Sequence, residues 1–134
     1  MRPDAEESQV VVAALIERGG RMLISQRRAD VGHAGRWEFP GGKREAGEHD
    51  GQALRRELRE ELGIDLGIGT HAWTERSGPL ELRFYWCAWA TSLRPRALEV
   101  VQFRWVRTET LAEYVFPPAD SNLVQALVDG RLAR

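Results

Sequence analysis

Three glutamates in one short segment have the spacing to act together. Glu57, Glu60 and Glu61 are three and four positions apart, which on a helix places them on one side, with β-carbons about 5–6 Å apart. Neighbouring arginines can offset the repulsion between like charges at that distance, so a solvated, salt-bridged face is one interpretation. The other is a metal site, because clustered carboxylate oxygens are the ligands that Mg²⁺ and Mn²⁺ prefer.

The glutamates belong to a longer motif, and its spacing decides between these interpretations. Gly42 is followed after five residues by Glu48, and after seven more by the run RELREELGI at residues 56–64. This string resembles the Nudix box, G-x5-E-x7-R-E-U-x-E-E-x-G-U with U a bulky aliphatic residue, at every specified position. The preceding segment WEFPGGK, residues 37–43, is similar to the segment that leads into the box in the MutT-type branch of that family. The motif therefore favours the metal site.

The resemblance implies an enzyme that hydrolyses nucleoside diphosphates linked to another moiety and that uses a divalent cation. Such a cation activates water and neutralises charge on phosphate oxygens. Arg56 matches a position that holds acidic partners in place without touching the substrate, and Glu48 matches one of those partners. The metal-binding positions that the resemblance implies are the carbonyl of Gly41 and the carboxylates of Glu57, Glu60 and Glu61.

Residues outside the box match further positions of MutT-type enzymes. Glu99, six residues before Trp105, matches a loop acid that binds or deprotonates water, the alternative being an exposed loop glutamate. Arg27, at the end of an expected strand, matches an arginine that contacts substrate phosphate, for which its planar fork is suited. A surface arginine is the alternative. Phe39 is expected to contact the substrate, whereas Asp50, at a variable position of the box, is expected to be solvated.

Asp120 departs from the MutT-type pattern and bears on the choice of substrate. The run FPPA at residues 116–119 is followed in MutT-type enzymes by an asparagine that reads oxidised guanine, whereas here Asp120 follows it. An ionised carboxylate only accepts hydrogen bonds, so it suits the N4 amino group of cytosine or the N1–H and N2–H of guanine and 8-oxoguanine. The same Pro-Ala-Asp pattern occurs in a MutT-related bacterial branch that acts on CTP and modified dCTP. Capping of a helix by Asp120 is the alternative.

Apolar patterning predicts the elements that must position these residues. Two apolar runs, 9–17 and 22–26, are separated by glycines and predict a hairpin. Strands and helices then mix without strict βαβ alternation, which indicates an α/β or α+β fold with a mixed sheet covered by helices. The Nudix resemblance implies an α/β/α sandwich. Residues 1–8 are expected to be a loose segment and 9–134 a single Nudix domain. The predicted helices are 52–62 (ending at Gly63), 108–114 and 119–128, and the later strands are 71–75, 80–89 and 101–106.

Composition narrows the classes of function. The 134 residues carry a net charge of −1, which argues against a bulk electrostatic nucleic-acid binder. The longest apolar run, residues 10–16, is far shorter than the roughly 20 residues needed to cross a bilayer. The N-terminus has no apolar stretch typical of a signal peptide. A single cysteine, Cys87, excludes an internal disulfide and an all-cysteine zinc site. A cytoplasmic protein is predicted.

The box and its flanks, through the family that they resemble, predict an Mg²⁺-dependent enzyme, with Mn²⁺ as the other candidate cation. Its expected reaction is hydrolysis of (deoxy)nucleoside triphosphates, such as 8-oxo-dGTP or cytosine nucleotides, to a monophosphate and pyrophosphate. The expected partner is the nucleotide substrate, with no membrane and no stable nucleic-acid partner. The alternatives are another substrate (ADP-ribose, a dinucleoside polyphosphate or an RNA 5′ end) and a non-catalytic nucleotide-binding module. The preferred base, the sugar, and monomer against homodimer stay open.

Overall fold

The strand β1 (Gln9–Arg18) is the middle of a mixed sheet in the computed structural model, which describes residues 9–29 and 34–134. The expected loose segment 1–8 lies outside the described residues. β1 pairs in parallel with β6 (Leu80–Ala88), and antiparallel with β2 (Arg21–Gln26) and β4 (Gly41–Lys43). The other strands are β3 (Trp37–Glu38) and β7 (Gln102–Arg107), which both pair with β2, and β5 (Ile68–Ser77), which pairs with β6.

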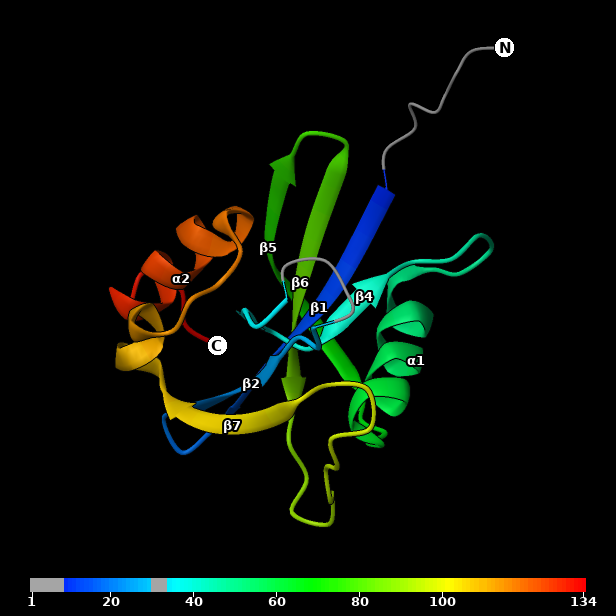
Figure 1. Ribbon diagram of the computed structural model, residues 1–134, viewed down its shortest axis with the longest axis horizontal. Helices are drawn as coiled ribbons and strands as arrows, with labels where there is room; N and C mark the ends of the chain where they lie inside the picture. The colour runs from blue at the N-terminus through cyan, green and yellow to red at the C-terminus, as the bar shows by residue number, and fades with distance from the viewer. Residues whose placement is uncertain (1–8, 30–33) are drawn as a thin grey trace.

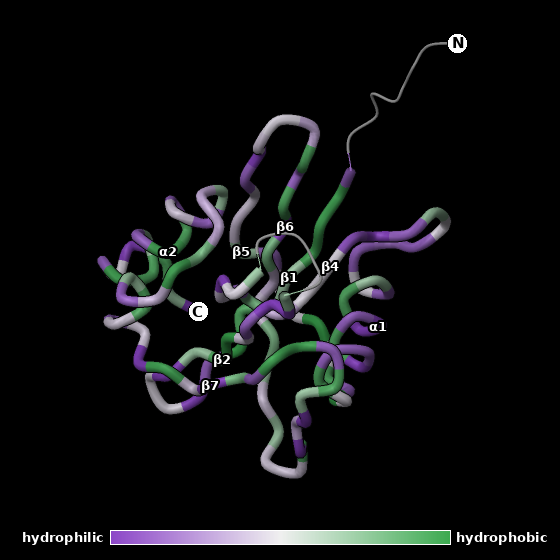
Figure 2. Tube along the Cα trace, viewed as in Figure 1, coloured by the Kyte–Doolittle hydropathy of each residue, from purple (hydrophilic) through white to green (hydrophobic). Residues whose placement is uncertain are grey.

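The side chains of β1 point alternately into two layers of the core. Val12, Ala14 and Ile16 pack in one cluster with the helix α1 (Asp50–Leu62), whereas Ala13 and Leu15 pack in another with α2 (Ser121–Val128). Successive side chains of a strand point to opposite faces, so this strand contributes to both layers. Figure 1 shows α1 and α2 on opposite sides of the sheet, and in Figure 2 hydrophobic residues follow β1 between them. The predicted sandwich with a mixed sheet is confirmed.

Local sequence explains both ends of α1. The helix begins at Asp50, two residues earlier than predicted, because His49 forms a capping box: its Nδ1 accepts from the Gln52 amide at 3.3 Å, and the Gln52 side chain accepts from the His49 amide at 2.9 Å. It ends at Gly63 in a left-handed conformation, as predicted. The buried face consists of Ala53, Leu54, Leu58 and Leu62. The glutamates of the box therefore lie off the buried apolar stripe.

The segment after β7 differs from the two α-helices that the sequence predicts. Residues 108–114 contain a 3₁₀ helix, η1 (Thr108–Glu113), and the predicted helix 119–128 starts as a 3₁₀ turn, η2 (Pro118–Asp120), before α2. Pro117 and Pro118 lack the amide hydrogen that a continuing helix needs. Instead the Asp120 amide donates to the Pro117 carbonyl at 2.9 Å, the three-residue spacing of a 3₁₀ turn. None of the helices within the described ranges is long and apolar enough to span a membrane.

Candidate active site

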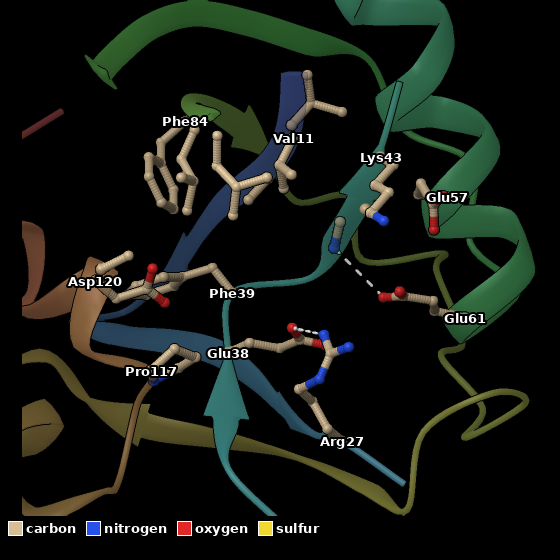
Figure 3. Close-up of a pocket in the computed structure, with 17 residues that line it drawn as sticks. Val11, Arg27, Glu38, Phe39, Lys43, Glu57, Glu61, Phe84, Pro117 and Asp120 are labelled. Atoms are coloured by element: carbon tan, nitrogen blue, oxygen red, sulfur yellow. Dashed lines mark hydrogen bonds and ion pairs between the residues drawn. The ribbon is translucent and has the colours of Figure 1, made fainter. Parts of the chain in front are cut away.

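A cavity of about 480 Å³ lies over β1 and β4 and connects α1 with η2. Figure 3 shows Glu57 and Glu61 entering it from α1, with Arg27 and Glu38 nearby and Asp120 at the opposite end. β1 and β6 contribute aliphatic and aromatic side chains to its walls, among them Val11, Leu82 and Phe84. The cavity therefore has an acidic end, beside α1, and an apolar end closed by Asp120.

Two glycines let β4 lie close to β1 on one side and to α1 on the other at the acidic end. A β-carbon at Gly41 would collide with the carbonyl of Val12, and one at Gly42 would lie 2.5 Å from Oε1 of Glu57. Glycine lets the backbone approach a neighbouring group this closely. The Gly41 amide also donates to Oε1 of Glu61 at 3.3 Å. The double glycine thus places two carboxylates of the box beside the backbone of β4.

Arg56 connects the loop before α1 to the acidic residues of that helix. Its Nε and Nη2 donate to the two carboxylate oxygens of Glu48, at 2.7 and 3.0 Å, and Nη2 also donates to the carbonyl of Lys43 at 3.0 Å. Nη1 donates to Glu57 at 3.0 Å and Glu60 at 3.2 Å. These bonds lower the pKa of Glu48 to about 2 and raise the pKa of Arg56. Arg56 and Glu48 do not line the cavity. They hold Glu57, which does, through the hydrogen bond that Arg56 donates to it.

Three carboxyl groups at the acidic end have raised pKa values. Burial raises the pKa of Glu61 to about 9, and the negative charges of Glu38 and Glu57 add to this. Burial also raises the pKa of Glu57, and that of Glu38 despite the nearby Arg27. A divalent cation would relieve this excess of negative charge, and the carboxylate and carbonyl oxygens present are suitable ligands for one. The residues at this end therefore fit a hard divalent cation.

The four acids and the one glycine expected to act near the cation are not all brought together. Glu57, Glu61 and Gly41 line the cavity, but Glu60 has a side chain 45% exposed and contacts Arg56 outside that wall. Within the described part of the chain, no three acidic, histidine or cysteine side chains converge as a ready-made metal site. Glu99 is exposed and does not line the cavity; its amide donates to the Glu61 carbonyl at 3.3 Å, and its charge contributes to the raised pKa of Glu57.

Arg27 and Phe39 both line the cavity, and between them lies an acid that the sequence interpretation missed. Arg27 donates from Nη1 to Oε1 of Glu38 at 2.7 Å. Phe39 is buried and packs edge-on against Phe84 and in a tilted arrangement against Phe116. The signal for Glu38 was its position as a charged residue between two aromatic ones, Trp37 and Phe39, in an extended segment. Period-two alternation turns it away from their buried faces.

Asp120 closes the apolar end without a hydrogen-bonding partner among the residues that the structure describes. It is 5% exposed, and its side chain does not cap α2, although it occupies the N-cap position. Burial raises its pKa to about 7, and the negative charges of Glu38 and Glu75 contribute. The structure thus gives no support to the capping alternative, and it leaves the carboxyl group of Asp120 facing the cavity (Figure 3).

The expectation that Asp50 is solvated is wrong. Its carboxylate accepts from Arg44 at 2.7 Å, from Arg83 at 3.1 Å and from the hydroxyl of Tyr85. The two partners on β6 are more than 30 positions away in the chain, so the box spacing carries no signal for them. They connect the first turn of α1 to the sheet and so help to orient the helix that carries Glu57 and Glu61.

Known proteins resemble this chain over most of its length. A family model described as NUDIX domain matches residues 11–126. The chain is 39% identical over 127 residues to the CTP pyrophosphohydrolase of Escherichia coli K12, covering 92% of this chain and 94% of the relative. It is 31% identical over 129 residues to the 8-oxo-dGTP diphosphatase of Haemophilus influenzae, covering 94% and 95%. A MutT structure from work on Aliivibrio salmonicida and Vibrio cholerae is 32% identical, with a TM-score of 0.78 and coverage of 92% and 99%.

Proposed function

This chain belongs to the NUDIX domain family, and on that premise we propose that it hydrolyses nucleoside triphosphates to a monophosphate and pyrophosphate, clearing oxidised or surplus nucleotides from the cytoplasm. One observation carries the proposal: two carboxylates of the Nudix box, Glu57 and Glu61, line the same cavity as Asp120. A nucleotide can then place its phosphates and its base at opposite ends. The relatives named CTP pyrophosphohydrolase and 8-oxo-dGTP diphosphatase support this substrate class.

At the acidic end, Glu57, Glu61 and the carbonyl of Gly41 would hold the cation, with Glu60 as a further carboxylate; we propose Mg²⁺, with Mn²⁺ as the alternative. When bound, the cation supplies Lewis-acid activation of water and charge neutralisation on the phosphate. Arg27 offers a planar fork of donors to a phosphate group. Arg27 donates to Glu38 in this structure, and phosphate would compete for that guanidinium.

The surrounding residues would position the reacting groups. Arg56 and Glu48 hold Glu57 in place through the hydrogen bonds described above. We propose Glu99 as the acid that orients or deprotonates the attacking water, since its loop lies against the end of α1. At the other end, Phe39 offers an aromatic wall to the base, and Asp120 offers a polar group that can discriminate one base edge from another.

A steady-state screen with Mg²⁺ tests the proposal. We expect kcat/KM to be highest among CTP, dCTP and 8-oxo-dGTP, with a nucleoside monophosphate and pyrophosphate as products. ADP-ribose and a dinucleoside polyphosphate serve as controls for the other substrate classes. Faster hydrolysis of either control, or release of orthophosphate from the triphosphates, would contradict the proposal. Binding of triphosphates without hydrolysis would favour a nucleotide-binding module instead.

A further inference from the structure

A hydrogen-bonded carboxylate connects the sheet to the segment that carries Asp120. Glu75, on β5, accepts from Nε1 of Trp73 at 3.0 Å with one oxygen. With the other it accepts from Nδ2 of Asn122 at 3.2 Å, across 47 positions of sequence. Trp73 is partly buried against the core on the α2 side of the sheet, so Glu75 is anchored on the strand and reaches to the first turn of α2.

The segment that Glu75 contacts has little polar support of its own. Asp120 lies two residues before Asn122, at the junction of η2 and α2, and its side chain makes no capping bond. Its backbone amide is bonded to Pro117 within the same turn, which fixes the shape of the turn but not its distance from the sheet. Apolar packing of Leu123 and Val124 holds α2 on the sheet, and the bond from Asn122 to Glu75 adds a polar link between the junction and β5.

We propose that Glu75 is a positioning residue for base selection: by holding Asn122 it fixes the junction of η2 and α2, and with it Asp120, against strand β5. This inference rests on the proposed function, since it takes the Asp120 end of the cavity to be where the base lies. Glu75 itself does not line the cavity and would act through Asn122 and through its charge.

The charges around Asp120 add an electrostatic consequence. The groups whose charges act on it are Glu38 from β3 and Glu75 from β5, and both are acidic; Arg27 pairs with Glu38. They add to burial in raising the pKa of Asp120 to about 7. A protonated carboxyl can donate to a base oxygen, whereas the ionised form only accepts, for example from an amino group. Neutralising Glu75 should therefore ionise Asp120 at lower pH, which disfavours a contact with a base oxygen such as O6 of 8-oxoguanine relative to a contact with the N4 amino group of cytosine.

The test compares Glu75→Gln and Asn122→Ala with Glu113→Gln, an exposed acid on η1 that serves as the matched control. Dissociation constants for CMP and 8-oxo-dGMP are measured from pH 6 to 9, because these products bind without turnover. We expect Glu75→Gln to shift the ratio of the two constants toward CMP by about 3-fold or more near neutral pH, and to move the pH midpoint of that ratio downward. Asn122→Ala keeps the charge of Glu75, so it should weaken both complexes and speed hydrogen exchange over residues 117–124 without moving the midpoint.

The outcomes separate this inference from the proposed function. The inference would be overturned if Glu75→Gln had the same ratio of dissociation constants, and the same pH midpoint of that ratio, as Glu113→Gln. This holds even if every variant hydrolyses triphosphates normally. Unchanged affinity and exchange in Asn122→Ala would overturn it as well, and this second variant covers a failure of Glu75→Gln to fold. A shifted ratio in Glu75→Gln, combined with a wild type that hydrolyses no triphosphate, would support the inference and contradict the proposed function. No binding of either monophosphate to the wild type would overturn the inference, and the hydrolysis screen would still decide the proposed function.

Discussion

Hydrogen bonding and burial move the pKa values of two acids of the Nudix box in opposite directions. Glu48 is stabilised as an anion because Arg56 donates to both of its oxygens, so its pKa falls to about 2. Glu61 is further from any guanidinium and receives one long bond from the Gly41 amide, so burial and neighbouring anions raise its pKa to about 9. The same motif therefore contains a residue that favours the folded state when ionised and one that opposes it.

Glu61→Gln should make the metal-free protein more stable at alkaline pH. A carboxyl whose pKa is raised on folding reduces stability as pH rises from its unfolded value, near 4.5, toward about 9. In EDTA at pH 8 we expect the variant to gain about 1–3 kcal/mol in the free energy of unfolding, and the gain to vanish near pH 4. Denaturant unfolding across this range measures it.

Glu60→Gln is the matched control for this prediction, because the Glu60 side chain is far more exposed. It should leave stability within about 0.5 kcal/mol, while both substitutions remove most turnover in Mg²⁺ because each removes a proposed ligand charge. Equal stability of the two variants at pH 8 would contradict the electrostatic account of Glu61. Near wild-type turnover of Glu60→Gln in saturating Mg²⁺ would reject its assignment as a ligand.

At the scale of elements, α1 is held on three sides by different kinds of contact. Its apolar face packs against β1, Arg56 connects it to the loop after β4, and Asp50 connects its first turn to β6. Gly42 then sets how closely β4 approaches Glu57. These contacts together determine where the carboxylates of the box point.

Arg56→Ala should damage stability and rate together. The change removes bonds to Glu48, to the Lys43 carbonyl and to Glu57, so we expect a loss of about 2–3 kcal/mol in unfolding free energy. Arg55→Ala is the control, since the ion pair of Arg55 with Asp65 is exposed and should contribute less than about 1 kcal/mol. If Arg56→Ala loses rate with an unchanged melting curve, Arg56 contacts the substrate and its positioning role is wrong.

The sequence predicted elements where local patterning decides them and missed contacts that depend on tertiary structure. The apolar stripe and Gly63 of α1 are local, so that helix was predicted to within two residues of its start. The contacts of Asp50 come from β6, and the position of Glu38 at the cavity depends on how β3 and β4 pair. Neither could be obtained from spacing along the chain.

For the whole molecule, two layers of the sandwich contribute to one cavity: α1 supplies the carboxylates and the η2–α2 segment supplies Asp120 (Figures 1 and 3). The box predicted the first set from its fixed spacing. The prediction for the other end depended on one residue, Asp120, which stands where the MutT-type pattern has asparagine. Only the structure could show whether Asp120 caps α2 instead, and its side chain makes no capping bond. The central claim is that a single substrate occupies both ends.

The most direct test is kcat/KM for CTP, dCTP, dGTP and 8-oxo-dGTP in the wild type, in Asp120→Asn and in Glu57→Gln. An amide gains donors for a base oxygen and loses acceptor capacity, so Asp120→Asn should shift preference from cytosine nucleotides toward 8-oxo-dGTP by about 5- to 150-fold. Glu57→Gln, at the acidic end, should lower all four values together and leave their ratios unchanged. Equal ratios in the wild type and Asp120→Asn would contradict the account and place base recognition elsewhere.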